Sequence, residues 1–165
     1  MEIGGLVNNA PILGRRVTIG EHTVYAGSSQ LSPFVLRRAN QLITLTGRPA
    51  DNWGDDRPYI VYPIRDFGVP DPQVFRNWLH QVICPALEKG TVFAVHCGAG
   101  LGRTGLFLAS LLVFHEHGVE DPIAEIRRRY HPGAVETQTQ AAFVFTLGGR
   151  EVPAKYRRVP RGRGR

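Results

Sequence analysis

The segment from His96 to Gly105 holds residue types that together could act on a phosphate group. A cysteine, Cys97, is followed six residues later by an arginine, Arg103, with three glycines between them. A glycine-rich loop that leads into a helix points several backbone N–H groups at one place, and the helix dipole makes that place favourable for an anion. The same field stabilises a thiolate, the nucleophilic form of cysteine, and a guanidinium group can hold two phosphate oxygens at once. The spacing therefore indicates phosphoryl transfer through a cysteine.

The sequence around this segment predicts the elements that must position it. A short run rich in β-branched residues, 91–95, precedes it, and a longer apolar run, 106–114, follows it. These runs predict a strand and a buried helix, so that the reactive residues lie at a strand–loop–helix junction. The glycines at 98, 100 and 102 are expected in the loop, and Gly105 is expected at the start of the helix.

The rest of the chain predicts an α/β domain in which helices pack on one central sheet. Apolar and β-branched runs between turn residues predict further strands at 17–20, 23–25, 42–45 and 59–62. Cap-then-proline pairs and terminating glycines predict further helices at 33–40, 72–89, 122–130 and 138–147. In the second of these, helical spacing predicts one buried face, made of Phe75, Trp78, Leu79, Val82, Ile83 and Leu87.

Length and charge predict one folded domain with a basic tail. The chain has 165 residues and a formal net charge of +6, and one domain is the natural expectation for this length. Residues 150–165 hold seven basic residues and one acidic residue, so they account for the whole net charge. We therefore expect a domain over 1–149 and a flexible, solvated Pro/Gly/Arg tail over 150–165. The alternative is that the tail is an electrostatic arm that contacts nucleic acid, a membrane or acidic surfaces.

The two cysteines, Cys84 and Cys97, form neither a disulfide framework nor a zinc spacing, which favours a reducing compartment. The longest apolar run is too short to span a bilayer, so a cytoplasmic protein is expected. The remaining histidines are scattered, and we predict no metal site and no cofactor. Cys84 is interpreted as a small buried hydrophobe, and a redox partnership with Cys97 is the alternative.

The segment from Cys97 to Thr104, with His96 before it, reads H-C-x5-R-T. This pattern resembles the signature of the cysteine-based protein phosphatases, and the chain looks closest to the small atypical dual-specificity (VH1-like) phosphatases. Further resemblances occur in order over about residues 20–147, at 24–27, 63–67, 123–128, 132–137 and 140. The resemblance implies a central, mostly parallel twisted sheet of about four to five strands flanked by helices. It also implies catalysis without a metal.

The resemblance implies a two-step mechanism. Cys97 attacks phosphorus and becomes a phosphocysteine, and Arg103 binds the phosphate with its guanidinium group. His96 orients the loop and supports the thiolate through hydrogen bonds, and Thr104 donates its hydroxyl to the sulfur. Phosphate oxygens are expected to contact the backbone amides of Gly98, Ala99, Gly100, Leu101, Gly102 and Arg103.

The leaving oxygen needs a proton, and the preferred donor is Asp66, on a loop that can lie over the site. The resemblance contributes to this choice. Asp71 is the competitor, although its place before Pro72 suits a helix cap, and an aspartate within 51–56 is a third option. Glu136 and Gln140 are candidates for positioning the water of the second step.

The substrate expectation follows from the neutral side chains inside the loop. Phosphoinositide phosphatases of the superfamily tend to carry lysines there, so this loop favours a phosphorylated protein or peptide that carries phosphotyrosine, or phosphoserine or phosphothreonine. Trp53 is expected either to stack on a substrate ring or to anchor its own loop. Two other functions stay open: an RNA 5′-triphosphatase of the same superfamily, motivated by the basic tail, and a non-catalytic phosphate-binding module.

Overall fold

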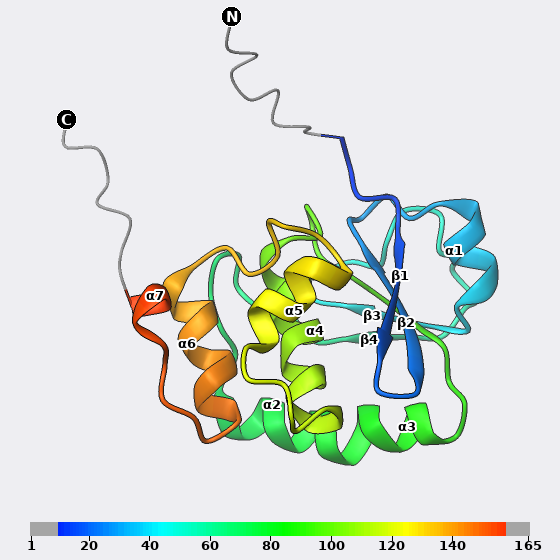
Figure 1. Cartoon of the computed structure of the whole chain (residues 1–165). Coiled ribbons are helices and arrows are strands. Elements are labelled where there is room, and N and C mark those ends of the chain that lie inside the picture. Colours follow the sequence, from blue (N-terminus) through cyan, green and yellow to red (C-terminus); the bar gives the residue numbers. More distant parts are fainter. Residues whose placement is uncertain (1–9, 158–165) are drawn as a thin grey trace, which may run out of the picture.

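Five strands form one sheet in the computed structural model of the protein, which describes residues 10–157. The sheet order is β1-β2-β5-β3-β4, and every neighbouring pair is parallel except β1 with β2. The α/β domain predicted from the sequence, and the mostly parallel sheet that the family resemblance implied, are thereby confirmed (Figure 1). The strands are β1 (Arg15–Ile19), β2 (His22–Gly27), β3 (Gln41–Thr44), β4 (Tyr59–Val61) and β5 (Phe93–His96).

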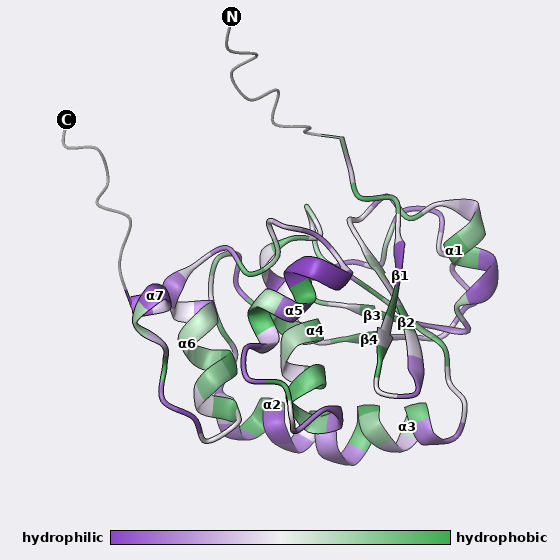
Figure 2. Ribbon diagram, in the orientation of Figure 1, coloured by the Kyte–Doolittle hydropathy of each residue, from purple (hydrophilic) through white to green (hydrophobic). Residues whose placement is uncertain are grey.

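Both faces of the sheet are covered, because successive side chains of a strand point to opposite faces. In β5, Phe93 and Val95 join the larger core, whereas Ala94 joins the smaller one. The smaller core lies under helix α1 (Pro33–Arg38) and the loop that contains Trp53. The larger core lies under the other helices, whose apolar residues face inward while hydrophilic residues colour the outer side of α5 (Figure 2).

The predicted helix 72–89 forms, but with a π-helical turn in its middle. It consists of α2 (Pro72–Trp78), the π turn η1 (Leu79–Ile83) and α3 (Cys84–Glu88). Four apolar residues spaced four apart are buried on the inner face of this helix: Phe75, Leu79, Ile83 and Leu87. A π turn is wider than an α-helical turn, so it keeps residues with this spacing on the same face. The prediction that Val82 is buried is wrong. Its side chain is 43% exposed, because the inner stripe does not follow the regular 3.6-residue period.

The first three helices after β5 are α4 (Gly102–His115), α5 (Pro122–Arg129) and α6 (Gln138–Leu147). The central helix α4 begins at Gly102, three residues before the expected start at Gly105. The predicted caps form at Asp121, which accepts from the backbone of Ala124, and at Thr137, which makes a capping box with Gln140. These caps fix where α5 and α6 begin beside the central loop.

The first half of the predicted tail lies against the folded body. Helix α7 (Ala154–Arg157) follows α6, and the Tyr156 hydroxyl donates to the carboxylate of Asp121, at 2.8 and 3.0 Å to its two oxygens. Lys155 forms an ion pair with the same carboxylate at 2.6 Å. The ordered structure therefore extends past the expected boundary at 149. Residues 158–165 lie outside the described residues. Within 10–157, no helix is long and apolar enough to cross a membrane.

Candidate active site

The loop of residues 97–103, here called the signature loop, leaves the carboxyl end of β5 and leads into α4. In parallel sheets this edge is where ligands commonly bind. Neighbouring elements hold the loop through its backbone. The amide of Leu45, after β3, donates to the carbonyl of His96 at 3.0 Å, and the amide of Ser29, after β2, donates to the carbonyl of Gly98 at 3.1 Å. The loop is therefore anchored from both adjacent strands.

At two positions of the signature loop, 100 and 102, a side chain would collide with a neighbouring group, which explains why glycine occurs there. Gly100 has φ +82°, and a Cβ atom there would lie 2.6 Å from the carbonyl carbon of Gly27. A Cβ atom on Gly102 would lie 2.6 Å from a carboxylate oxygen of Glu136. A side chain at position 100 would meet backbone, which cannot rotate away. The loop thus needs glycine at this position to approach the end of β2.

Cys97 lies at the base of the loop, with 2% of its surface exposed. The Thr104 hydroxyl donates to its Sγ atom at 3.1 Å, which is the contact expected from the sequence. Thr104 is itself buried in the first turn of α4. A hydrogen bond to sulfur stabilises the thiolate form of the cysteine.

His96 is 1% exposed, and its ring contacts the signature loop through the backbone. Nδ1 lies 3.3 Å from the carbonyl oxygen of Cys97, while Nε2 is buried and has no hydrogen-bond partner among the described residues. Burial lowers the pKa of His96, so the neutral imidazole is favoured. The ring contacts the loop as expected, but its hydrogen bond goes to the carbonyl of Cys97 and not to the sulfur.

Arg103 connects the signature loop to the loop of residues 65–70, here called the Asp66 loop. Its Nη1 donates to the carbonyl of Ile64 at 3.1 Å, and its Nη2 lies 3.4 Å from a carboxylate oxygen of Asp66. The Arg103 side chain is 12% exposed and that of Asp66 is 61% exposed. The Nε atom of Arg103 is buried and has no hydrogen-bond partner among the described residues. The guanidinium group therefore keeps a donor for a further acceptor.

The other two proposed proton donors take different places. Asp71 caps α2 by accepting from the backbone amide of Val74 at 2.9 Å, so its carboxylate has a structural task. The aspartates of the third option, Asp51, Asp55 and Asp56, have exposed side chains, and the backbone amide of Asp51 donates to the carbonyl of Ser29 at 2.8 Å. Of the aspartates considered from the sequence, Asp66 is the one in an ion pair with Arg103.

Gln140 lies in the first turn of α6 and Glu136 just before that helix, and side-chain atoms of both lie within 3.2 Å of where a Cβ atom on Gly102 would be. Gln140 is fully buried, and its side-chain oxygen accepts from the amides of Glu136 and Thr137 at 2.9 and 3.2 Å. Its side-chain nitrogen donates to the carbonyl of Gly68 at 3.3 Å. Gln140 therefore connects α6 to the Asp66 loop. Glu136 is exposed, and its carboxylate lies beside Gly102 at the start of α4.

One residue that supports the loop was not singled out from the sequence. The Tyr130 hydroxyl, at the end of α5, donates to the carbonyl of Gly100 at 2.6 Å, and the residue is 2% exposed. Burial, with a smaller effect of Cys97, raises the pKa of Tyr130 above its ordinary value. The sequence offered one indication of this role. Tyr130 comes just before His131, Pro132 and Gly133, which end the helix, and a side chain at a helix end can support a neighbouring loop.

The structure also decides between the interpretations left open for Trp53 and Cys84. Trp53 is 2% exposed and its indole donates to the carbonyl of Pro58, so it anchors its own loop and its ring has no exposed face on which a substrate could stack. Cys84 is half-buried beside His115, at the opposite end of α4 from Cys97. A helix of that length separates its ends by about 20 Å, so a disulfide with Cys97 is incompatible with this fold.

The comparison with known families agrees with this geometry. The family model PTP-SAK, described as "Swiss Army Knife protein, DSP-PTPase phosphatase domain", matches residues 40–147. The chain belongs to this family. The matched range holds the signature loop, the Asp66 loop and the start of α6. The family is one of dual-specificity and tyrosine phosphatases, as the sequence resemblance predicted.

Curated relatives of this phosphatase domain match over about half of the chain. Protein tyrosine phosphatase domain-containing protein 1 of Mus musculus is 37% identical over 76 residues, which are 46% of this chain and 10% of that protein. An uncharacterised protein of Methanocaldococcus jannaschii is 36% identical over 88 residues, 53% of this chain and 58% of that protein. The human tyrosine-protein phosphatase non-receptor type 2 is 33% identical over 99 residues, 53% of this chain and 22% of that protein. The match thus spans less than two thirds of each of these relatives.

Solved structures share the fold of this domain at low sequence identity. Tk-PTP in its active form superposes with a TM-score of 0.64 at 23% identity, over 82% of this chain and 97% of that one. Kinase associated phosphatase, with its catalytic site cysteine replaced by serine, gives a TM-score of 0.68 at 17% identity, over 82% and 93% of the two chains. At these identities the likeness supports the fold alone.

Proposed function

We propose that this phosphatase domain hydrolyses phosphotyrosine, and also phosphoserine or phosphothreonine, in proteins or peptides through a phosphocysteine intermediate. The observation that carries the proposal is the position of Arg103, which belongs to the loop of Cys97 and lies 3.4 Å from the carboxylate of Asp66. A nucleophile, an anion-binding loop and a proton donor are thereby gathered around one place.

In the first step, Cys97 Sγ attacks phosphorus, and the sulfur–phosphorus bond forms while the bond to the ester oxygen breaks. The backbone amides of residues 98–103 and the guanidinium group of Arg103 hold the other three oxygens, where negative charge lies in the transition state. The free donor at Arg103 Nε is suited to one of these oxygens. Asp66, carrying a proton, transfers it to the leaving oxygen.

In the second step, a water molecule attacks phosphorus and the bond to sulfur breaks. Asp66 now takes a proton from the water, and the hydrogen bond from Thr104 stabilises the thiolate that leaves. Of the two candidates for positioning this water, Glu136 has an exposed carboxylate beside Gly102, whereas the side-chain oxygen of Gln140 already accepts two hydrogen bonds. We therefore assign this task to Glu136.

The side chains of the signature loop favour a single phosphate. Between Cys97 and Arg103 the loop has only glycine, alanine and leucine, so these positions provide no additional positive charge to bind a second phosphate. An RNA 5′-triphosphatase drew its support from the basic tail. Lys155 and Arg157, in the described part of that tail, are paired with Asp121 and Glu151. A non-catalytic phosphate-binding module has no use for a nucleophile and a proton donor. No observation favours either alternative.

The test compares phosphotyrosyl peptide, phosphothreonyl peptide and triphosphate-ended RNA as substrates of the full chain. We expect turnover of the phosphopeptides, loss of turnover in Cys97→Ser with phosphopeptide binding retained, and normal turnover in Cys84→Ser, which changes the other cysteine. Acid quenching during turnover should trap phosphate on wild-type protein and not on Cys97→Ser. Unchanged turnover in Cys97→Ser, or a preference for the RNA, would contradict the proposal.

A further inference from the structure

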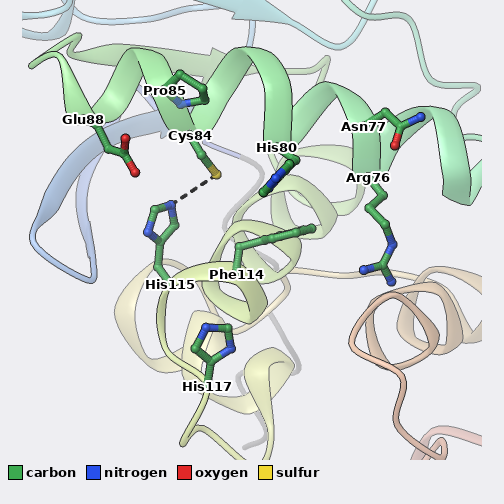
Figure 3. Close-up of a pocket in the computed structure, with 9 residues that line it drawn as sticks. All are labelled: Arg76, Asn77, His80, Cys84, Pro85, Glu88, Phe114, His115 and His117. Carbon is green, nitrogen blue, oxygen red and sulfur yellow. Dashed lines mark hydrogen bonds between the residues drawn. The ribbon is translucent and has the colours of Figure 1, made fainter.

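A second group of reactive side chains lines a cavity of about 720 Å³ between the α2–α3 helix and the carboxyl end of α4. The cavity lies at the opposite end of α4 from the signature loop. Its wall includes three of the six histidines of the chain, one of its two cysteines and a glutamate (Figure 3). These are His80, His115, His117, Cys84 and Glu88. The proposed phosphatase mechanism uses none of them.

Cys84 and His115 contact each other in this cavity. Cys84 Sγ lies 3.5 Å from Nε2 of His115, as the dashed line in Figure 3 marks. Zinc binds sulfur at about 2.3 Å and imidazole nitrogen at about 2.0 Å, so at a tetrahedral angle the two ligand atoms are about 3.5 Å apart. The pair already has the separation of two ligands of one zinc ion.

The helix that carries Cys84 presents further ligand types on the same side. His80 precedes Cys84 by four residues and Glu88 follows it by four, and Figure 3 shows all three side chains on the side of the helix that faces His115. The π turn η1 lies within this stretch, and such turns are frequent at functional sites. Thiolate and imidazole are ligands that suit zinc and not magnesium or calcium.

The charge of Glu88 affects the pKa of both Cys84 and His115, which indicates that its carboxylate lies near both side chains. Burial is the main cause that raises the pKa of Cys84, and the negative charge of Glu88 raises it further. Burial is also the main cause that lowers the pKa of His115, and Glu88 opposes that effect. Within residues 10–157 no three such ligands are already assembled, but Glu88 has an exposed side chain that can rotate.

We propose that Cys84, His115 and Glu88 form a zinc site, with a water molecule as the fourth ligand. On binding, the Cys84 S–H bond breaks, a sulfur–zinc bond forms and the proton passes to solvent. His115 contributes Nε2 and Glu88 one carboxylate oxygen. The ion connects α3 to the carboxyl end of α4, so it stabilises the folded protein without taking part in phosphate chemistry.

The experiment uses the full chain with Cys97→Ser as the background, because the chain then has a single thiol. Cobalt, which replaces zinc in such sites, is titrated and the sulfur-to-cobalt charge-transfer absorption is recorded, followed by competition with zinc. We expect one cobalt per chain with this absorption, displacement by zinc, and a higher melting temperature in zinc. Adding Cys84→Ser should abolish the absorption and the thermal effect.

Two further variants test the other ligands. His115→Ala and Glu88→Gln should each weaken zinc binding by more than about tenfold. Changing a residue that only hydrogen-bonds to a metal ligand already costs about that much in affinity, and the loss of a ligand should cost more. His131→Ala, a histidine outside the cavity, should leave it unchanged. Metal-free melting curves show whether each variant is folded, and exposed Glu88 gives a variant that does not disturb the core. Absent charge-transfer absorption in the background protein, or its persistence with Cys84→Ser, would overturn the site. An unchanged affinity in folded His115→Ala or Glu88→Gln would do the same.

Discussion

The side-chain amide of Gln140 donates to the carbonyl of Gly68 at 3.3 Å, which connects the start of α6 to the Asp66 loop. The Thr137 hydroxyl adds a second contact, to the carbonyl of Phe67 at 3.4 Å. Both acceptors lie within two residues of Asp66. Since Asp66 is more than half exposed and depends on its loop for its place, these contacts position the proposed proton donor against Arg103.

Gln140→Ala should therefore reduce turnover more than phosphate binding. A misplaced proton donor can cost up to about a hundredfold in rate. We expect the loss to be greatest for esters with poor leaving groups, while inhibition by inorganic phosphate is unchanged. Gln138→Ala, in the same helix turn, is the control and should keep normal rates, because the Gln138 side chain donates to the carbonyl of Arg157 and not to the Asp66 loop. An equal loss for good and poor leaving groups would remove Gln140 from this positioning role.

Asp66→Asn and Asp71→Asn separate the two candidates for the general acid. Asparagine caps helices as well as aspartate does, so Asp71→Asn should retain both stability and activity. Asp66→Asn should lower kcat by about 10²–10⁴-fold for phenyl phosphate, which needs a proton on its leaving group, and much less for nitrophenyl phosphate. Steady-state assays of both esters with both variants decide the matter. The opposite pattern would make Asp71 the acid.

Thr104→Val should slow the second chemical step. Removing a hydrogen bond to a charged group costs about 1.5–3 kcal/mol, which for the departing thiolate is about 10–150-fold in the rate of phosphocysteine hydrolysis. Rapid-mixing experiments should then show a burst of alcohol product followed by slow turnover. Thr104→Ser keeps the hydroxyl and should behave like wild type. Absence of a burst in Thr104→Val would indicate that the sulfur does not depend on this donor.

The parts of this site that could be predicted from the sequence are those set by local spacing. Cys97, Arg103 and Thr104 lie within eight consecutive residues, so the strand–loop–helix junction alone brings them together. The caps at Asp71 and Asp121 likewise depend on neighbouring residues. The arrangement of the signature loop could therefore be predicted largely from the spacing of residues in the sequence.

The contacts that could not be predicted join residues distant in the chain. Gln140 and Gly68 are 72 residues apart, and the sequence of α6 does not indicate which carbonyl its side chain meets. The packing of Tyr156 on Asp121 is similar, because the surrounding Pro/Gly/Arg composition is typical of a solvated tail. Val82 was misplaced for a different reason, since a π turn changes the helical period on which the prediction relied.

Gly100→Ala and Gly98→Ala should have opposite outcomes. At position 100 the added Cβ meets the Gly27 carbonyl and the backbone has φ +82°, a conformation that costs about 1–3 kcal/mol for a residue with a side chain. At position 98 the nearest atom to an added Cβ is Arg103 Nη2 at 3.6 Å, an ordinary contact. We expect loss of phosphate binding and a lower melting temperature for Gly100→Ala only. Calorimetry measures the melting temperature and titration measures phosphate binding. Normal phosphate binding by Gly100→Ala would contradict this prediction.

Glu116 should make the stability of the fold depend on acid pH. Its carboxylate accepts from Arg129 at 2.5 and 2.8 Å and from the backbone of Gly20, and these bonds, chiefly with Arg129, lower its pKa from 4.5 to about 2. A lowered pKa in the folded state means that the stabilisation is complete above the unfolded value and is lost as the pH falls from about 4.5 to about 2. Glu116→Gln should therefore unfold at lower urea than wild type at pH 7, and the difference should shrink at pH 3. Glu120→Gln, which changes a nearby acid that has no such pairing with Arg129, controls for the loss of a charge. A difference that stays constant across this pH range would mean that the ionised carboxylate of Glu116 does not stabilise the protein.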